Sequence, residues 1–173
     1  MSETPAFASS ITAPSTVGGA AVTITDLSHL SKLVVKTTPA RSDGLDVAFG
    51  SSAVTDEAVV CGTRPGEWTI IGDASGTAAI AERLDAHVVD VTHGRVLIEV
   101  AGPAATSTLE KVCSLDWTDE MMPDGAVTSA SVAKVACDVI RHDGLARAYW
   151  LSADRSFGQY LYDALIDAAA EFS

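Results

Sequence analysis

The clearest hydrophobic pattern in the chain lies near its C-terminal end and predicts an amphipathic helix. The predicted apolar face consists of Phe157, Tyr160, Leu161, Ala164, Leu165 and Ala168, which recur at helical spacing. Acidic residues occupy the opposite face. Ser156 and Gln159 have the spacing of a capping box, in which each side chain satisfies a backbone N–H of the first turn. We therefore expect a helix that begins near Ser156 and anchors the core.

A nearly continuous apolar run in the middle of the chain predicts a buried strand and then a helix. Residues 95–100 combine alternation with a mostly apolar composition, which is typical of a central strand. Gly102 and Pro103 follow, and proline fits the first helical position because no backbone N–H is needed there. Ala105, Leu109 and Val112 then predict one helix face packed on a sheet.

Shorter patterns predict further strands that are separated by turns. Strands are expected near residues 33–35, 45–49, 58–61, 67–72 and 146–152, and turns near 39–44, 63–66 and 142–144. A helix is expected from about 73 to 84, with its first turn capped by residues 73–75. Residues 127–140 indicate one long strand or a strand with a bulge.

Two short motifs occur twice and indicate an internal duplication. Asp26-Leu-Ser-His29 matches Asp90-Val-Thr-His93, and each is followed by an aliphatic strand. The segment from Trp68 to Ser75 matches that from Tyr149 to Ser156, and both lead from a strand to a helix through Asp-x-Ser. Because the order is the same, we expect two β-rich halves, about 22–86 and 87–173, each with helices packed on its sheet.

These patterns predict a single α+β domain over residues 22–173, preceded by a flexible N-terminal arm. Residues 1–21 are rich in Ser, Thr, Ala, Gly and Pro and contain little to bury. Two interpretations of the arm stay open: a disordered end, or an extended arm that lies over a partner subunit.

Composition limits the classes of partner. The net charge is −12, with 23 acidic and 11 basic residues, which argues against nucleic acid and against anionic membranes. No apolar run approaches the ~20 residues that a membrane span needs. Cys61, Cys113 and Cys137 are widely spaced and odd in number, as expected for reduced core thiols. No secretory signal is visible, so we expect a cytoplasmic location.

The candidates for chemistry are few. His29 and His93 follow turn residues, and each acts either as a general base or as a side chain that holds its own turn. Asp138, His142 and Asp143 either cluster at a hairpin end or belong to a solvated turn. The four histidines lack the spacing of metal ligands, so no metal site is expected.

An acidic loop over residues 114–126 contains three large apolar side chains, Trp117, Met121 and Met122. Either these side chains fold back onto the core of this chain, or they anchor a partner, as buried aromatic residues and methionines often do. They are the residues for which we predict a partner interface.

Several motifs together resemble a known family. Asp90-Val-Thr-His93, the strand after it and Gly102-Pro103-Ala104-Ala105…Leu109 resemble a signature of the aminomethyltransferase folate-binding superfamily. Within it, Pro65-Gly66-Glu67-Trp68 and the segment from Asp154 to Leu161 resemble the gamma subunit family of heterotetrameric sarcosine oxidase. The resemblance extends over about residues 24–172.

This resemblance implies a folate-binding aminomethyltransferase-like fold with ferredoxin-like pieces, and a non-catalytic gamma subunit beside alpha, beta and delta subunits. The family's complex oxidises sarcosine to glycine, with formation of hydrogen peroxide and methylene-tetrahydrofolate. The resemblance implies that FAD, FMN, NAD, tetrahydrofolate and zinc belong to the other subunits, with no cofactor in this chain.

The chain departs from its folate-using relatives in the region that leads to Asp138. Those relatives have a Gly-rich hairpin and an Asp-Asp pair, whereas residues 132–138 contain no glycine and one carboxylate. Ser152 stands where they tend to have asparagine. We therefore expect no catalytic, cofactor-binding or metal-binding residues in this chain, and the resemblance implies that Arg95 either neutralises a folate glutamate tail or forms a surface ion pair. The alternative is a stand-alone folate-binding or aminomethyltransferase-like protein.

Overall fold

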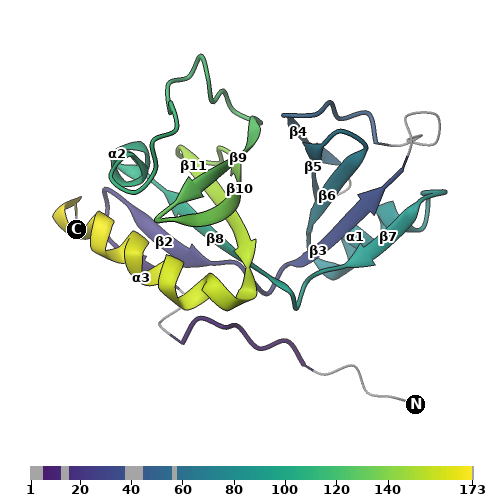
Figure 1. The fold of residues 1–173 in the computed structure, drawn as a ribbon, viewed down its shortest axis with the longest axis horizontal. Helices are drawn as coiled ribbons and strands as arrows, with labels where there is room; N and C mark the ends of the chain where they lie inside the picture. The colour runs from purple at the N-terminus through teal and green to yellow at the C-terminus, as the bar shows by residue number, and fades with distance from the viewer. Residues whose placement is uncertain (1–5, 13–15, 38–44, 56–57, 173) are drawn as a thin grey trace.

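Two antiparallel sheets form the centre of the molecule, with helices on the outer face of each (Figure 1). The structure is a computed structural model, and it describes residues 6–12, 16–37, 45–55 and 58–172. The turn predicted over residues 39–44 lies outside the described residues. The α+β fold class predicted from the sequence is confirmed.

The strands divide between the two sheets as follows. The first sheet has the order β1 (Thr16–Gly18), β2 (Thr23–Asp26), β8 (Arg95–Ala101), β11 (Ala148–Asp154), β10 (Val135–Arg141) and β9 (Val127–Val132). The second has the order β4 (Ser52–Thr55), β5 (Ala58–Arg64), β6 (Glu67–Gly72), β3 (Ser31–Lys36) and β7 (His87–Asp90). The helices are α1 (Ala74–Ala81), α2 (Ala105–Glu110) and α3 (Gly158–Ala169).

Three apolar clusters hold these layers together. The largest packs α2 and α3 on the outer face of the first sheet, and includes Leu109, Leu161 and Leu165. A second packs Ile80 of α1 on the outer face of the second sheet. The third contains residues of both sheets and fills the layer between them: Val59, Cys61, Ile71, Leu97, Val127, Ile140 and Trp150. The sheets are therefore joined by a shared core.

The strand orders of the two sheets match, as the predicted duplication requires, and the first strand of each half lies in the sheet of the other half. β2 pairs with β8, and β7 pairs with β3. The turns that follow β2 and β7 stabilise these pairings between the halves through matching hydrogen bonds. Leu97 N donates to Ser28 Oγ at 3.0 Å, and Lys32 N donates to Thr92 Oγ1 at 2.9 Å. Hydroxyl side chains at matching turn positions therefore pin the opposite half.

The second repeated motif also has one structure in both halves. Asp73 Oδ1 accepts a hydrogen bond from Gly76 N at 2.7 Å, at the start of α1. Asp154 Oδ1 accepts one from Ser156 N at 2.9 Å, before the 3-10 turn Arg155–Phe157 that leads into α3. In both halves an aspartate thus satisfies the first backbone N–H groups of the helical segment.

The prediction for residues 127–140 was wrong, because the chain reverses there. β9 and β10 form a hairpin whose turn residues Ala133 and Lys134 both have positive φ, 48° and 68°. Turns of this kind usually contain glycine or asparagine, so the sequence carried no turn signal. Tertiary contacts hold the turn instead: Ala133 N donates to Val112 O at 2.7 Å, and Tyr160 Oη donates to Ala133 O at 3.1 Å.

The C-terminal helix was predicted correctly, and Leu161, Leu165 and Ala168 are buried as predicted, but the cap and part of the buried face differ. Asp154, not Ser156, supplies the cap. Phe157 and Tyr160 are exposed, whereas Tyr162 is fully buried, so the buried face is rotated relative to the predicted one. The 3-10 turn before α3 changes the angle at which the helix starts, and spacing counted from residue 157 therefore misassigns the face.

Two shorter elements also differ from the sequence prediction. No strand forms at residues 45–49, where Phe49 makes one isolated bridge to Gly62. The helix after Pro103 begins at Ala105, and Gly102 has a φ of 120°. A Cβ on Gly102 would lie 2.6 Å from Ala21 O, so the close approach of these two segments requires glycine.

Part of the predicted N-terminal arm is docked on the domain. Ile11 is buried in the larger core, and Thr12 N donates to Gln159 Oε1 at 2.7 Å. Ser9 Oγ donates to Asp26 Oδ2 at 2.5 Å. Residues 16–18 form β1 at the edge of the first sheet. These contacts attach residues 9–18, within the described ranges, to β2 and to the start of α3.

Candidate functional site

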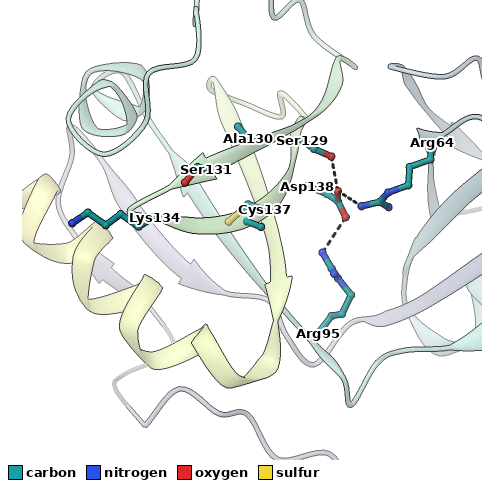
Figure 2. A pocket seen from close by; sticks show the side chains of 9 residues that line it. Arg64, Arg95, Ser129, Ala130, Ser131, Lys134, Cys137 and Asp138 are labelled. Atoms are coloured by element: carbon teal, nitrogen blue, oxygen red, sulfur yellow. Dashed lines mark hydrogen bonds and ion pairs between the residues drawn. The ribbon is translucent and has the colours of Figure 1, made fainter.

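An ion-pair cluster centred on Asp138 lies between the two sheets (Figure 2). Asp138 comes from β10 and Arg95 from the start of β8, whereas Arg64 comes from the end of β5 in the other sheet. Arg95 Nη2 lies 3.0 Å from Asp138 Oδ2, and Arg64 Nη2 lies 3.3 Å from Oδ1. The carboxylate therefore bridges the two sheets.

Polar side chains of the first sheet fix this arrangement. Ser129 Oγ donates to Asp138 Oδ1 at 3.0 Å from the neighbouring strand β9. Arg95 also donates to Ser152, through Nε to Oγ at 3.0 Å and through Nη2 to the carbonyl at 2.8 Å. Because Asp138 accepts three hydrogen bonds and Arg95 donates three, both side chains are held in one orientation.

A second carboxylate lies on the opposite side of Arg64. Glu67 accepts from Arg64 Nη1 at 2.7 Å and lies 3.0 Å from Lys36 Nζ. Burial opposes the charge on Glu67, but the hydrogen bonds from Lys36 and Arg64 prevail and lower its pKa. The hydrogen bond to Glu67, and then the charge of Asp138, raise the pKa of Arg64. Cations and carboxylates thus alternate across the gap.

Two cavities adjoin this cluster and share part of their lining. The larger has a volume of about 430 Å³ and the other about 320 Å³, and Arg64, Arg95 and Asp138 line both. The larger cavity extends over β9 and β10 to Lys134. The smaller extends over β3, β6 and β7 to Lys36. We call these two adjoining cavities together the inter-sheet cleft.

The duplication provides an internal reference for this cleft. The matching strand pairings place Val59 and Ile71 at the positions that correspond to Asp138 and Ser152. Leu30, one residue before β3, lies where the same register continued by one residue corresponds to Arg95. These three residues pack in or against the apolar layer between the sheets. One half therefore fills these positions with apolar contacts, and the other lines a cleft with charged and polar side chains.

A buried lysine lies elsewhere in the layer between the sheets. Lys32 is fully buried, and its Nζ donates to Ser28 O at 2.8 Å and to Leu30 O at 2.6 Å. Burial lowers the pKa of Lys32 to about 8, against the charges of Asp26 and Asp90, which raise it. The corresponding position in the other half is Leu97, so this lysine also breaks the internal symmetry.

The predicted chemistry candidates do not gather at the cleft. His29 and His93 are exposed, and His93 stacks on Phe7 with ring centroids 5.5 Å apart. His142 packs against Trp150, and Asp143 pairs with Arg141, so neither joins Asp138. Among the described residues, no group of three or more His, Cys, Asp or Glu side chains is placed to hold a metal ion.

The three apolar residues of the acidic loop have different positions. Trp117 and Met122 are buried in the core of this chain, and Trp117 packs edge-on against Tyr149. The predicted partner contact is therefore corrected for Trp117 and Met122, because both side chains pack in the apolar layer under α2 of this chain. Met121 is 61% exposed, so its role at an interface stays a prediction.

The cysteines occupy buried positions. Cys61, Cys113 and Cys137 are free thiols, as the sequence predicted. Burial raises the pKa of Cys61 and of Cys137 to about 12, which makes both thiols poor nucleophiles.

Sequence reasoning missed Arg64 and the cleft itself. Arg64 belongs to the turn at residues 63–66, which identifies the hairpin but carries no sign of an ion pair with a residue 74 positions away. Two signals were available: the carboxylate of Asp138 in a strand that is otherwise apolar or small up to Arg141, and Arg95, for which an ion pair was one interpretation. A charge in such a strand requires a partner, but the pattern does not say which one.

Comparison with solved structures shows the fold. The chain is similar to a chain of heterotetrameric sarcosine oxidase from Corynebacterium sp. U-96 in complex with pyrrole 2-carboxylate, with a TM-score of 0.75 and 20% identity over 92% of this chain and 89% of that one. It is also similar to the glycine cleavage system aminomethyltransferase T from Bartonella henselae, with a TM-score of 0.63 and 15% identity. That match covers 84% of this chain and 48% of the other, so this chain spans about half of the aminomethyltransferase.

Comparison by sequence shows the family. No curated protein matches the sequence. Within the described ranges, no helix is long and apolar enough to cross a membrane. The model of the sarcosine oxidase, gamma subunit family matches residues 42–171, which is most of the chain. The chain therefore belongs to the sarcosine oxidase gamma subunit family.

Proposed function

We propose that this chain is a non-catalytic accessory subunit of a heterotetrameric sarcosine-oxidase-like complex. Membership of the gamma subunit family carries this proposal. The similarity to a chain of heterotetrameric sarcosine oxidase extends over nearly the whole molecule and supports it. The partners in this proposal are alpha, beta and delta subunits, and the assembly works in the cytoplasm.

The state of Asp138 supports an accessory role. Two arginines and a serine hold this carboxylate, so its oxygens are already committed to ion pairs and a hydrogen bond. In the proposal, the oxidation of sarcosine to glycine takes place in other subunits, which also carry FAD, FMN, NAD, tetrahydrofolate and zinc. Hydrogen peroxide and methylene-tetrahydrofolate form there.

Co-expression tests the assembly. The full chain, tagged and produced with candidate alpha, beta and delta subunits, should co-purify with flavin absorbance and with sarcosine-dependent formation of hydrogen peroxide. A chain that elutes as a monomer beside the co-expressed subunits would contradict the proposal.

Met121 is the side chain in the acidic loop that we propose as a partner contact. It is exposed beside Glu120 and Pro123, on the wall of a cavity of about 370 Å³. Met121→Asp should weaken co-purification, because burial of a carboxylate against a partner is unfavourable. Phe157→Asp, which alters another exposed apolar side chain outside this loop, is the matched control. Equal co-purification of both variants would remove Met121 from the interface.

The second candidate function is folate binding by this chain itself. The similarity to the fold of an aminomethyltransferase and the presence of a cleft at Asp138 support it. Titration of the full chain with tetrahydrofolate, followed by tryptophan fluorescence, tests it. No saturable change up to millimolar ligand rejects this candidate and leaves the accessory role untouched.

A further inference from the structure

We propose that the inter-sheet cleft binds a small elongated anion that carries at least two carboxylate or phosphate groups. Arg64 and Arg95 would hold the centre of this ligand, with Lys36 and Lys134 near its two ends. The proposal is independent of the accessory role, because it concerns a site that lies within this one chain.

The charge of the cleft is opposite to that of the protein. The whole chain has a net charge of −12, with only 11 basic residues. Four of these basic residues, Lys36, Arg64, Arg95 and Lys134, line the cleft, together with two carboxylates, Glu67 and Asp138. The cleft thus has two positive charges in excess. In an otherwise acidic molecule, a region with a positive excess attracts anions. It also repels the acidic surfaces of other molecules less than the rest of the protein does.

The arginines retain donors for a ligand. A guanidinium has five N–H donors. Arg64 uses one contact to Glu67 and one to Asp138, and its side chain is 53% exposed. Arg95 is directed by Ser152 and Asp138 through Nε and Nη2, which leaves Nη1 for other contacts. Two guanidiniums held on either side of one carboxylate are already oriented for a second anion.

The shape of the cleft favours an elongated ligand. The floor of the larger cavity is formed by small side chains on one face of the β9–β10 hairpin, because Ser129 pairs with Asp138 and Ser131 pairs with Ala136. In Figure 2, Lys134 and Arg64 lie at opposite ends of the side chains that line this cavity. Both cavity volumes, about 430 and about 320 Å³, suit a small metabolite.

Backbone geometry also brings Lys134 to the cleft. Lys134 and Ala133 have positive φ, a conformation that residues with a Cβ rarely adopt. Tyr160 and Val112 hold this turn by hydrogen bonds to Ala133. A sterically unfavourable backbone that tertiary contacts maintain is often found at a functional site. Here it places Lys134 on the lining of the larger cavity, and in Figure 2 its side chain extends away from Asp138 at the end opposite Arg64.

The internal duplication argues that the charges are not needed for the fold. Leu30, Val59 and Ile71 fill the corresponding positions of the other half with apolar contacts. The same strand arrangement therefore forms without Arg95, Asp138 and Ser152. Polar residues that replace a packed apolar set and leave a cavity are better explained by a ligand than by stability.

Isothermal titration calorimetry on the full chain tests the proposal. The probes are citrate as a polycarboxylate, pyrophosphate as a phosphate, and glycerol as a neutral control, all at constant ionic strength. We expect saturable binding of citrate, pyrophosphate or both, and none of glycerol. The affinity should fall as sodium chloride is added, because salt screens the attraction. The two anion arms identify whether carboxylate or phosphate is preferred.

Variants then assign the site. Arg64→Gln should weaken binding of the preferred probe about 10-fold, and Lys134→Gln about 3-fold, since charge-assisted hydrogen bonds are lost. Arg155→Gln is the matched control, because it removes one partly exposed cation whose side chain contacts the His93 carbonyl, outside the cleft. Asp138→Asn should tighten binding, because it releases both arginines from an internal competitor.

Two results would overturn the proposal. The first is the absence of saturable binding of both anions at millimolar concentration. The second is an affinity for the probe that stays unchanged in Arg64→Gln, Lys134→Gln and Asp138→Asn, as it does in the control Arg155→Gln. If Arg64→Gln fails to fold, the opposite signs expected for Lys134→Gln and Asp138→Asn still decide the question, because loss of structure weakens binding in both.

Discussion

The two halves of the molecule share a strand arrangement but differ in how they meet. In the first half, Val59 and Ile71 belong to the apolar layer between the sheets, and Leu30 packs against it. In the second half, the corresponding residues are Asp138 and Arg95, which line a cleft, and Ser152, which accepts hydrogen bonds from Arg95. The fold thus tolerates either solution at the same positions.

The difference between the two halves indicates which contacts stabilise the molecule. A paired and hydrogen-bonded ion cluster contributes little net stability relative to apolar residues of similar volume. The apolar clusters on either side of each sheet must therefore supply most of the stability. Each of the following substitutions alters one half while the other serves as its control.

The largest effects are expected where the helices pack on the sheets. Leu165 of α3 and Ile80 of α1 are both almost fully buried. Leu165→Ala and Ile80→Ala should each lower the free energy of unfolding by about 2–5 kcal/mol, because each leaves a cavity. Urea denaturation followed by circular dichroism measures this loss.

The shape of those curves compares the halves further. Because the apolar layer between the sheets is shared, both variants should keep one cooperative transition. A curve with two steps, in which only the half that carries the substitution unfolds early, would contradict the coupling of the halves.

The next effect compares the cleft with its apolar counterpart. Asp138→Val alone should destabilise the protein by about 2–4 kcal/mol, because it leaves the partly buried Arg95 without its carboxylate. The triple variant Arg95→Leu, Asp138→Val, Ser152→Ile reproduces the apolar set of the other half. It should recover most of that loss, within about 1 kcal/mol of the wild type. Thermal denaturation of both variants measures the difference, and a triple variant as unstable as Asp138→Val would refute the equivalence of the positions.

A smaller, pH-dependent effect distinguishes Lys32 from Leu97. Burial lowers the pKa of Lys32 to about 8, below the value of 10.5 in the unfolded chain. Between these values the unfolded chain binds the proton that the folded chain has released, so stability rises with pH by at most about 1.4 kcal/mol per pH unit.

The variant Lys32→Met should lack this rise. The buried thiols Cys61 and Cys137, whose pKa values are raised to about 12, remove stability above pH 9 in both proteins, so they cancel in the difference. Urea denaturation of both proteins at pH 7, 8 and 9 isolates the contribution of Lys32. Parallel curves would show that the ammonium group is not desolvated.

The smallest effects are expected at the two equivalent helix caps. Hydrogen bonds from Gly76 and Ser75 lower the pKa of Asp73, and hydrogen bonds from Ser156 lower that of Asp154. Asp73→Ala and Asp154→Ala should each cause a small loss of melting temperature at neutral pH. Because a lowered pKa contributes stability that disappears as pH falls through it, each variant should approach the wild type as pH falls below 3.8, the ordinary value for aspartate. Unequal losses in the two halves would show that the caps are not equivalent.

The sequence predicted the fold class, the duplication and the long C-terminal helix because these depend on local patterns. It missed the β9–β10 hairpin, since Ala133 and Lys134 adopt a turn conformation that distant contacts impose. It also missed the cleft, because Arg64, Arg95 and Asp138 come together from three separate strands. Ion pairs across sheets leave no periodic signal, so the sequence indicated charged side chains at Asp138 and Arg95 but not that they pair with each other.

The exchange of β2 and β7 has a consequence for how the chain reaches its structure. β2 finds its neighbour in β8, about 75 residues later, and β3 finds β7 more than 50 residues later. During synthesis, the first half emerges without β7, and β2 then has only β1 as a neighbour. Its sheet therefore keeps an open edge at β3, and its interface stays exposed, until β7 and β8 have left the ribosome. The duplication thus produced two halves that complete their folding only together.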